Sequence, residues 1–207
     1  MPIRRRRLLL TAAPALLAGL GTRPGWAQRA DGRMNERAVG SPDAKLTVQE
    51  WFSLTCTHCA HVSETVFPEV KAKLIDTGKI RYVFRDFPLD QLALTAAAVA
   101  RALPEDRYLP FVESLLATQD RWAFNRGVDP LAEIEHQAAL AGMTDTAFAA
   151  VMADQHLREE ILAEQDDGQK RYDIAGTPTF IFGTQKIGPI TSYGEFATGV
   201  EKGLAAG

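Results

Sequence analysis

The two cysteines of this 207-residue chain lie three positions apart, in the stretch Cys56-Thr57-His58-Cys59. Two thiols this close can form a disulfide with each other and exchange it with the thiols of another molecule. Because the thiolate is the reactive form of cysteine, the thiol with the lower pKa becomes the nucleophile. We expect Cys56, the more N-terminal and more exposed sulfur, to be the atom that attacks and is attacked. Cys59 would be its resolving partner.

The residues around the pair predict where it sits. Residues 46–52 are apolar, aromatic and β-branched, which is typical of a buried strand, and residues 60–75 carry apolar side chains at helical spacing. The pair therefore lies at the start of a helix, where unpaired N–H groups and the helix dipole stabilise a thiolate. Pro68 is expected to kink or break this helix, and Gly78 to end it.

Three other interpretations of the pair compete with exchange chemistry. A purely structural disulfide across so short a loop would remove little entropy from the unfolded chain. Structural zinc needs four converging ligands, usually from two separate segments, whereas the available ligands lie within six consecutive residues. Those ligands are Cys56, His58, Cys59 and His61. The third alternative is a pair of inert buried thiols.

The first residues predict export from the cytoplasm. Residues 1–27 contain a run of arginines, an apolar stretch and a small-x-small cleavage site at Gly25-Trp26-Ala27, a pattern typical of a secretory signal. Adjacent arginines allow either the Sec or the twin-arginine route. We therefore expect a periplasmic protein, in a compartment where thiol pairs can be oxidised.

Composition limits the partners of the mature chain. Cleavage after residue 27 would remove five arginines and no acidic residue, so the net charge would go from −3 to −8. An acidic chain disfavours nucleic acids and anionic membrane surfaces as partners. About 180 mature residues are ample for one domain with a large insertion. We expect a monomer.

The pattern of elements predicts an α/β fold. A polar lead-in (28–44) contains a short edge strand near 37–39, and residues 79–85 form a second strand parallel to the first. Strand signal vanishes from 89 to 172, where we expect four or five short helices; within them, the charged tract 158–171 indicates a solvated helix face.

The C-terminal part completes the pattern with two antiparallel strands, 179–182 and 185–187, and a helix over 193–205. With the helical part removed, the order β-α-β, β-β-α is that of the thioredoxin fold. The predicted architecture is thus a thioredoxin fold, formed by residues 45–88 and 173–207, with an all-helical domain inserted at 89–172.

With these elements in place, the chain resembles the DsbA-like thiol–disulfide oxidoreductases of the bacterial periplasm, in particular their thioredoxin-4-type branch. Apart from the helical insertion, three stretches carry the resemblance: Val48-Gln49-Glu50-Trp51-Phe52 leading to Cys56-Thr57-His58-Cys59, Tyr82-Val83-Phe84-Arg85-Asp86-Phe87-Pro88-Leu89, and Gly176-Thr177-Pro178-Thr179-Phe180. The match covers essentially all of the mature chain.

The resemblance implies roles for individual residues. Cys56 matches the nucleophilic cysteine, and Cys59 the resolving one. Pro178 matches the cis-proline that faces the cysteines, and Thr177 before it offers backbone groups to an extended substrate. Glu50 matches a buried acid beneath the sulfurs that accepts the proton of Cys59 during exchange. An exposed strand position for Glu50, with Gln49 inward, is the alternative.

The two residues between the cysteines set the redox behaviour. The His58 imidazole is expected to donate a hydrogen bond or positive charge to the Cys56 thiolate, which favours the reduced form and makes the disulfide more oxidising. Thr57 replaces the proline best known at that position in the family, and its amide is a further donor to the thiolate. We place Thr57 with Thr177 and Pro178 among the predicted substrate-binding residues.

The resulting hypothesis is a periplasmic dithiol oxidase that introduces disulfides into unfolded exported proteins. The resemblance implies a DsbB-like membrane quinone reductase as the partner that reoxidises it. No cofactor or metal is expected, because the sulfurs are the redox centre. Two alternatives stay open: an isomerase or reductase of DsbC or DsbG type, and a periplasmic protein that binds Cu(I) through Cys56, His58 and Cys59.

Overall fold

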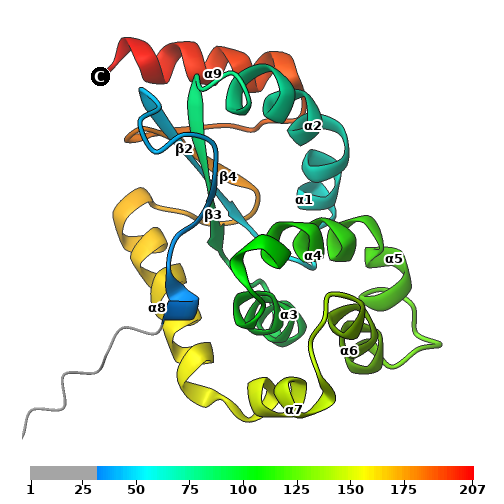
Figure 1. Ribbon diagram of the computed structural model, residues 1–207. Coiled ribbons are helices and arrows are strands. Elements are labelled where there is room, and N and C mark those ends of the chain that lie inside the picture. The colour runs from blue at the N-terminus through cyan, green and yellow to red at the C-terminus, as the bar shows by residue number, and fades with distance from the viewer. Residues whose placement is uncertain (1–31) are drawn as a thin grey trace, which may run out of the picture.

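The computed structural model describes residues 32–207, which form a mixed sheet with helices on both faces (Figure 1). The predicted signal sequence lies outside the described residues. Within them, five strands pair in the order β1-β3-β2-β4-β5. The strands are β1 Arg37–Val39, β2 Leu46–Phe52, β3 Ile80–Asp86, β4 Thr179–Phe182 and β5 Gln185–Ile187.

The pairing of the strands confirms the predicted topology. β2 and β3 are parallel, with Leu46 opposite Ile80 and Phe52 opposite Asp86. The short edge strand β1 pairs with β3, β4 pairs with β2, and β5 pairs with β4, all three antiparallel. A parallel β2–β3 pair requires a crossover, which the intervening helical segment provides.

That helical segment runs from residue 57 to residue 75, and it alternates between two kinds of helix. It consists of α1 Thr57–His61, the π-helical turn η2 Val62–Val66, α2 Phe67–Val70 and the π-helical turn η3 Lys71–Ile75. Of the kink or break expected at Pro68, a break does not occur. The backbone widens one turn earlier, where the Phe67 N–H reaches back five residues to the Val62 carbonyl, and the helical path continues through the proline. Gly78, with a φ of 73°, turns the chain toward β3.

Alternate residues of the strands face different helices. Val48, Glu50 and Phe52 point toward the side covered by the 57–75 segment and by α9 (Tyr193–Ala205), whose Phe196 stacks on Tyr82. Trp51 points to the other side, against α8. There a Cβ at position 168 would lie 2.5 Å from the Trp51 ring, so only glycine fits.

Between β3 and β4 the chain is helical, as predicted, but with more helices than expected. Within the described residues this region holds six helices rather than four or five. They are α3 Gln91–Ala102, α4 Glu105–Ala117, α5 Gln119–Trp122, α6 Pro130–Leu140, α7 Asp145–Ala153 and α8 Gln155–Tyr172. The additional helix is α5, a single turn of 4 residues that is too short to show helical periodicity. The expectation of short helices is wrong for α8, which has 18 residues.

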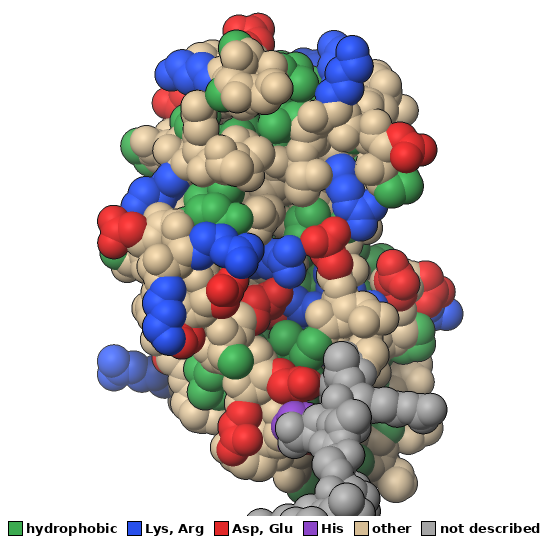
Figure 2. Space-filling model, turned by 90° about the vertical axis from the view of Figure 1, so that its left-hand side faces the viewer, with side chains coloured by type: hydrophobic (Ala, Val, Ile, Leu, Met, Phe, Trp, Pro, Cys, Tyr) green, Lys and Arg blue, Asp and Glu red, His purple; other side chains and the backbone are tan. Residues whose placement is uncertain are grey.

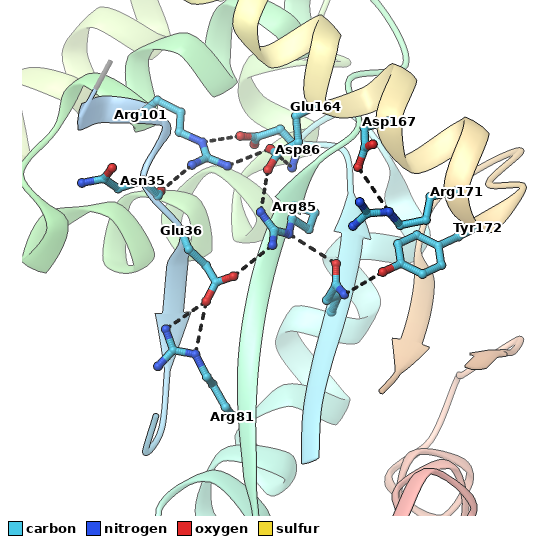
Figure 3. Close-up of polar contacts among 11 residues, drawn as sticks. Asn35, Glu36, Arg81, Arg85, Asp86, Arg101, Glu164, Asp167, Arg171 and Tyr172 are labelled. Atoms are coloured by element: carbon cyan, nitrogen blue, oxygen red, sulfur yellow. Dashed lines mark hydrogen bonds and ion pairs between the residues drawn. The ribbon is translucent and has the colours of Figure 1, made fainter. Parts of the chain in front are cut away.

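The charged tract on α8 is not simply a solvated face. Glu164 is largely buried and forms ion pairs with Arg85 and with Arg101, which also pairs with Asp86 at 2.5 Å (Figure 3). Arg101 comes from α3 and is fully buried. These pairs join the end of β3 to α3 and α8, so tertiary contacts decide where this charge lies.

The exposed charges are arranged differently. Figure 2 shows acidic and basic side chains interspersed over one face of the molecule. Glu36, for example, is more exposed than Glu164 and pairs with Arg81 and with Arg85, at 2.9 Å in each case.

The architecture is therefore an α/β thioredoxin fold with an additional helical region, as predicted. The boundaries proposed for the separate domains stay predictions. None of the helices in residues 32–207 combines the length and apolar character needed to cross a membrane.

Candidate active site

The two cysteines lie at the junction between β2 and α1. Cys56 is the N-cap of α1, with extended backbone angles; its N–H donates to the Ser53 carbonyl at 3.1 Å. Cys59 lies within α1, one turn along. Both are free thiols, and Cys56 is 7% exposed whereas Cys59 is 1% exposed. The more N-terminal sulfur is thus the more accessible one, as the sequence predicted.

Several groups stabilise the thiolate of Cys56. A hydrogen bond from the Cys59 thiol is the largest influence, and partial burial opposes it. The backbone N–H groups of Cys59 and His58 add further hydrogen bonds. Together they lower the pKa of Cys56 from 9.0 to about 5. At neutral pH this sulfur is a thiolate, which is the nucleophilic form.

Cys59 has the opposite character. Burial raises the pKa of the Cys59 thiol well above its usual value, and its hydrogen bond to Cys56 and the nearby charge of Glu50 act in the same direction. The Cys59 sulfur therefore keeps its proton while Cys56 loses its own. The two thiols of one short motif are divided into a nucleophile and a proton-holding partner.

Glu50 lies beneath the sulfurs, buried on the side of β2 that faces the helices. Burial raises its pKa to about 7, against the hydrogen bond from Tyr82, which lowers it; the charge of Cys56 raises it further. A carboxyl with this pKa can both give and take a proton near neutral pH. The inward orientation predicted for Glu50, rather than for Gln49, is confirmed.

Tyr82 is a member of the site that the sequence analysis missed. Its hydroxyl donates to Glu50 Oε2 at 2.7 Å, from the neighbouring strand β3. Tyr82 itself is buried, and burial raises its pKa well above 10, so it remains a donor. The available signal was the alternation of β3, which places Tyr82 on the same face as Glu50.

The segment before β4 faces Cys56 from the other end of the chain. The Thr177–Pro178 peptide bond is cis, as the resemblance implied, and Cys56 Sγ lies 3.3 Å from the Thr177 carbonyl oxygen. The structure thus brings Thr177 and Pro178 to the sulfurs across 121 residues of sequence. A substrate role for these two residues stays a prediction.

The two residues between the cysteines are exposed. Thr57 and His58 lie in the first turn of α1 with their side chains at the surface. The contribution of His58 to the Cys56 pKa comes through its backbone N–H. The predicted role of its imidazole, and that of Thr57, stay predictions.

A side chain of the helical region anchors the active-site loop. Gln119, on α5, is 5% exposed, and its Nε2 donates to the carbonyl oxygens of Leu54 at 2.7 Å and Cys56 at 3.1 Å. Two more bonds tie the loop to the residues just before α3: Thr55 donates to Asp90, the N-cap of α3, at 2.7 Å, and Ser53 accepts from the Leu89 N–H at 3.3 Å. Sequence reasoning did not identify Gln119, because only the tertiary structure brings α5 to the loop.

Acidic, histidine and cysteine side chains do not gather into a metal-binding group of three or more within residues 32–207. The described site consists of two thiols with widely separated pKa values, a carboxyl titrating near neutrality and a peptide segment beside the nucleophile. These groups are suited to thiol–disulfide exchange, in which a thiolate attacks a sulfur and the leaving sulfur takes up a proton.

Comparison with known proteins identifies the family to which this chain belongs. The sequence model of the Thioredoxin_4 family, described as thioredoxin, matches residues 33–202. A protein of Rickettsia bellii named as a protein-disulfide oxidoreductase is 34% identical over 148 residues, which are 70% of this chain and 56% of the relative. A similarly named protein of Rickettsia felis is 31% identical over 82% of this chain and 60% of its own length. The chain thus spans less than two thirds of these curated relatives.

Solved structures agree. α-DsbA1 of Wolbachia pipientis matches with a TM-score of 0.74 and 28% identity, over 84% of this chain and 92% of that one. BdbD from Bacillus subtilis shares the fold, with a TM-score of 0.72 at 20% identity over 82% and 93% of the two chains. The chain belongs to the Thioredoxin_4 family of DsbA-like thiol–disulfide oxidoreductases, which confirms the resemblance read from its motifs.

Proposed function

We propose that this protein is a periplasmic dithiol oxidase, which introduces disulfides into exported proteins through a Cys56–Cys59 disulfide. The observation that carries the proposal is the depressed pKa of Cys56, about 5 against the usual 9.0. Hydrogen bonds that stabilise the thiolate stabilise the reduced form of the pair. A disulfide whose reduced form is stabilised is a strong oxidant.

The reaction follows from the difference between the two thiols. A substrate thiolate attacks Cys56 Sγ of the disulfide, the S–S bond breaks, and Cys59 departs with the electron pair and takes a proton from Glu50. A second substrate thiolate then attacks the substrate sulfur of the mixed disulfide, and Cys56 leaves as its stable thiolate. The substrate loses two electrons and gains a disulfide, while Cys56 and Cys59 gain those electrons.

The proposal includes a place of action and partners. A cleaved signal over residues 1–27 would deliver the protein, as a monomer, to the periplasm. Its substrates would be unfolded exported proteins, whose extended backbone would lie along Thr177 and Pro178 beside the Cys56 sulfur. A DsbB-like quinone reductase in the membrane would reoxidise the pair. The 28% identity to α-DsbA1 over most of the chain supports this assignment.

The decisive experiment equilibrates the protein with glutathione buffers of graded potential and traps the free thiols. The oxidase proposal expects the pair to stay mostly reduced until the buffer is strongly oxidising. A pair that stays oxidised in reducing buffers would contradict it and indicate a reductase or isomerase of DsbC or DsbG type. Titration of the reduced protein with Cu(I) tests the remaining alternative: tight stoichiometric binding without oxidase activity would favour a copper-binding protein.

A further inference from the structure

The turn that leads from β2 into Cys56 is held by side chains as well as by its own backbone. Residues 53–56 form a turn that is closed by the hydrogen bond from the Cys56 N–H to the Ser53 carbonyl at 3.1 Å. Thr55, at the second central position of this turn, directly precedes Cys56. A group that fixes Thr55 therefore also fixes where the Cys56 sulfur lies.

Asp90, the N-cap of α3, binds the turn with one carboxylate oxygen and its own helix with the other. Its Oδ1 accepts from the Ala93 N–H at 2.7 Å, and its Oδ2 accepts from the Thr55 hydroxyl at 2.7 Å. Both distances are typical of charge-assisted hydrogen bonds. One exposed carboxylate thus ties the active-site turn to the first turn of α3, across 35 residues of sequence.

Ser53 completes the link from the other side of the turn. Its side chain is 1% exposed, and its Oγ accepts from the Leu89 N–H at 3.3 Å and lies 3.3 Å from Thr55 Oγ1. Because the Thr55 hydroxyl gives its proton to the Asp90 carboxylate, it accepts from Ser53. The hydrogen bonds therefore form a ring that begins at the N–H of Leu89 and ends at the carboxylate of the next residue, Asp90.

This ring matters more when the cysteine pair is reduced. In the oxidised protein the disulfide itself holds Cys56 against Cys59. In the reduced protein Cys56 has no covalent tie to Cys59, and non-covalent contacts keep its sulfur beside the Cys59 thiol and 3.3 Å from the Thr177 carbonyl oxygen. A contact that stabilises the reduced form more than the oxidised form makes the disulfide a stronger oxidant.

We propose that Asp90 is a positioning residue for Cys56, which holds the active-site turn through Thr55 and thereby makes the Cys56–Cys59 disulfide more oxidising. The inference deepens the proposed function and rests on its exchange chemistry. Asp90 acts through Thr55 rather than at the sulfurs. The start of α3, and with it the helical region, then contributes to the redox equilibrium of the cysteine pair.

Three substitutions separate the link from the helix cap and from the charge. Thr55→Val removes the hydroxyl and leaves the carboxylate and its cap in place. Asp90→Ser keeps a good N-cap but is too short to reach both partners. Asp90→Asn removes the charge but keeps an oxygen for the cap and an amide that can donate to Thr55 Oγ1. The matched control is Asp129→Ser, the same change at the exposed N-cap of α6.

The test equilibrates each variant with glutathione buffers and measures urea unfolding of its oxidised and its reduced form. We expect Thr55→Val and Asp90→Ser to lower the equilibrium constant for reduction of the disulfide by about three- to tenfold, the usual range for one hydrogen bond. The unfolding equilibrium of the reduced form should change by more than that of the oxidised form, by the same factor. Asp90→Asn and Asp129→Ser should keep the wild-type equilibrium with glutathione.

A merely structural link would destabilise both forms equally and leave the glutathione equilibrium unchanged in Thr55→Val and Asp90→Ser, and that result would overturn the inference. An equal shift in Asp90→Asn and Asp90→Ser would also overturn it, because the charge would then be the cause. The wild-type value tests the proposed function separately. A weakly oxidising wild type contradicts that function, whereas the inference concerns only the difference between the variants and the wild type.

Discussion

Within residues 32–207, Glu50 and Asp86 are the two most deeply buried acidic residues, and they differ in the partner that each one faces. Asp86, at the end of β3, is 2% exposed and faces the guanidinium of Arg101, which also pairs with Glu164 (Figure 3). Glu50, on the adjacent strand, is 6% exposed and faces a hydroxyl, that of Tyr82. One acid has a buried cation as its partner and the other has a neutral donor.

The difference decides what each acid can do. Burial alone would lower the pKa of Arg101, but the carboxylates of Asp86 and Glu164 outweigh it and hold Arg101 in its charged form. A charge compensated in this way fixes three elements in place and has no proton to move. Near Glu50 the neutral Tyr82 offsets only part of the desolvation, so the carboxyl titrates at about pH 7. The uncompensated acid lies at the sulfurs, where a mobile proton is needed.

Removing the guanidinium of Arg101, the partner of Asp86, should have the largest effect on stability. Arg101→Met leaves Asp86 buried without its partner, which we expect to cost about 3–5 kcal/mol of unfolding free energy. Urea unfolding measures it. Arg107→Met is the control, because Arg107 pairs with Asp106 at the exposed surface and should contribute about 0–1 kcal/mol. Equal losses in the two variants would show that the buried pair is not a structural tie.

Removing the uncompensated acid should have the opposite effect on stability. The pKa of Glu50 is about 7 in the folded state against 4.5 for an ordinary glutamate, so the unfolded chain ionises first as the pH rises. The wild type should therefore lose on the order of 3 kcal/mol between about pH 4.5 and 7, and Glu50→Gln should not. The oxidised protein is the form to unfold in urea, because its cysteines do not titrate. The loss should be somewhat smaller in that form, since the charge of Cys56 no longer raises the pKa of Glu50.

The same variant should be a poor catalyst. Without a proton donor for Cys59, disulfide exchange with a model peptide should slow about 100-fold in Glu50→Gln, a typical effect for a lost general acid. A variant that is more stable at pH 8 but exchanges at the wild-type rate would refute a role for Glu50 in proton transfer.

A variant of Gln119 tests whether neutral hydrogen bonds at the active-site loop stabilise the fold as much as the buried Arg101–Asp86 ion pair does. Gln119→Leu removes the donor to the Leu54 and Cys56 carbonyls, and we expect a loss of about 1–3 kcal/mol in urea unfolding. The exposed Gln155→Leu on α8 serves as the control. A loss as small as that of the control would mean that the loop keeps its position without α5.

Tyr82→Phe removes the hydrogen bond that offsets part of the effect of burial on the pKa of Glu50. The Tyr82 hydroxyl lowers the pKa of Glu50, so its loss should raise that pKa, by about one pH unit for an interaction on the order of 1 kcal/mol. Carboxyl-carbon NMR of the oxidised protein follows the titration. An unchanged or lower midpoint would contradict the assignment of Tyr82 as the donor.

The smallest effect is expected from the exposed side chain of His58. His58→Ala should make the pair less oxidising in glutathione buffers. Because the imidazole is exposed and screened, the change should stay under about 1 kcal/mol. His156→Ala, at an exposed position on α8, is the control. An equilibrium identical to the wild type would show that the backbone N–H of His58, and not its ring, stabilises the thiolate.

The sequence by itself determined the reactive cysteine pair and most of the secondary-structure elements that position it. The spacing of Cys56 and Cys59 after an apolar strand is a local pattern, and so is the alternation that gave β2, β3 and the C-terminal hairpin. Thr177-Pro178 was recognisable because a short motif precedes a strand. These features depend on neighbours within a few residues, and such patterns are visible in a linear chain.

The tertiary structure decided which buried charges are paired. Glu164 reads as one more charge on a polar helix, and only the packing of α8 against β3 and α3 brings it to two arginines. Tyr82 and Gln119 likewise reach the site from separate elements. Their roles depend on desolvation and on distances across the fold, and neither quantity is encoded in the spacing of residues along the chain.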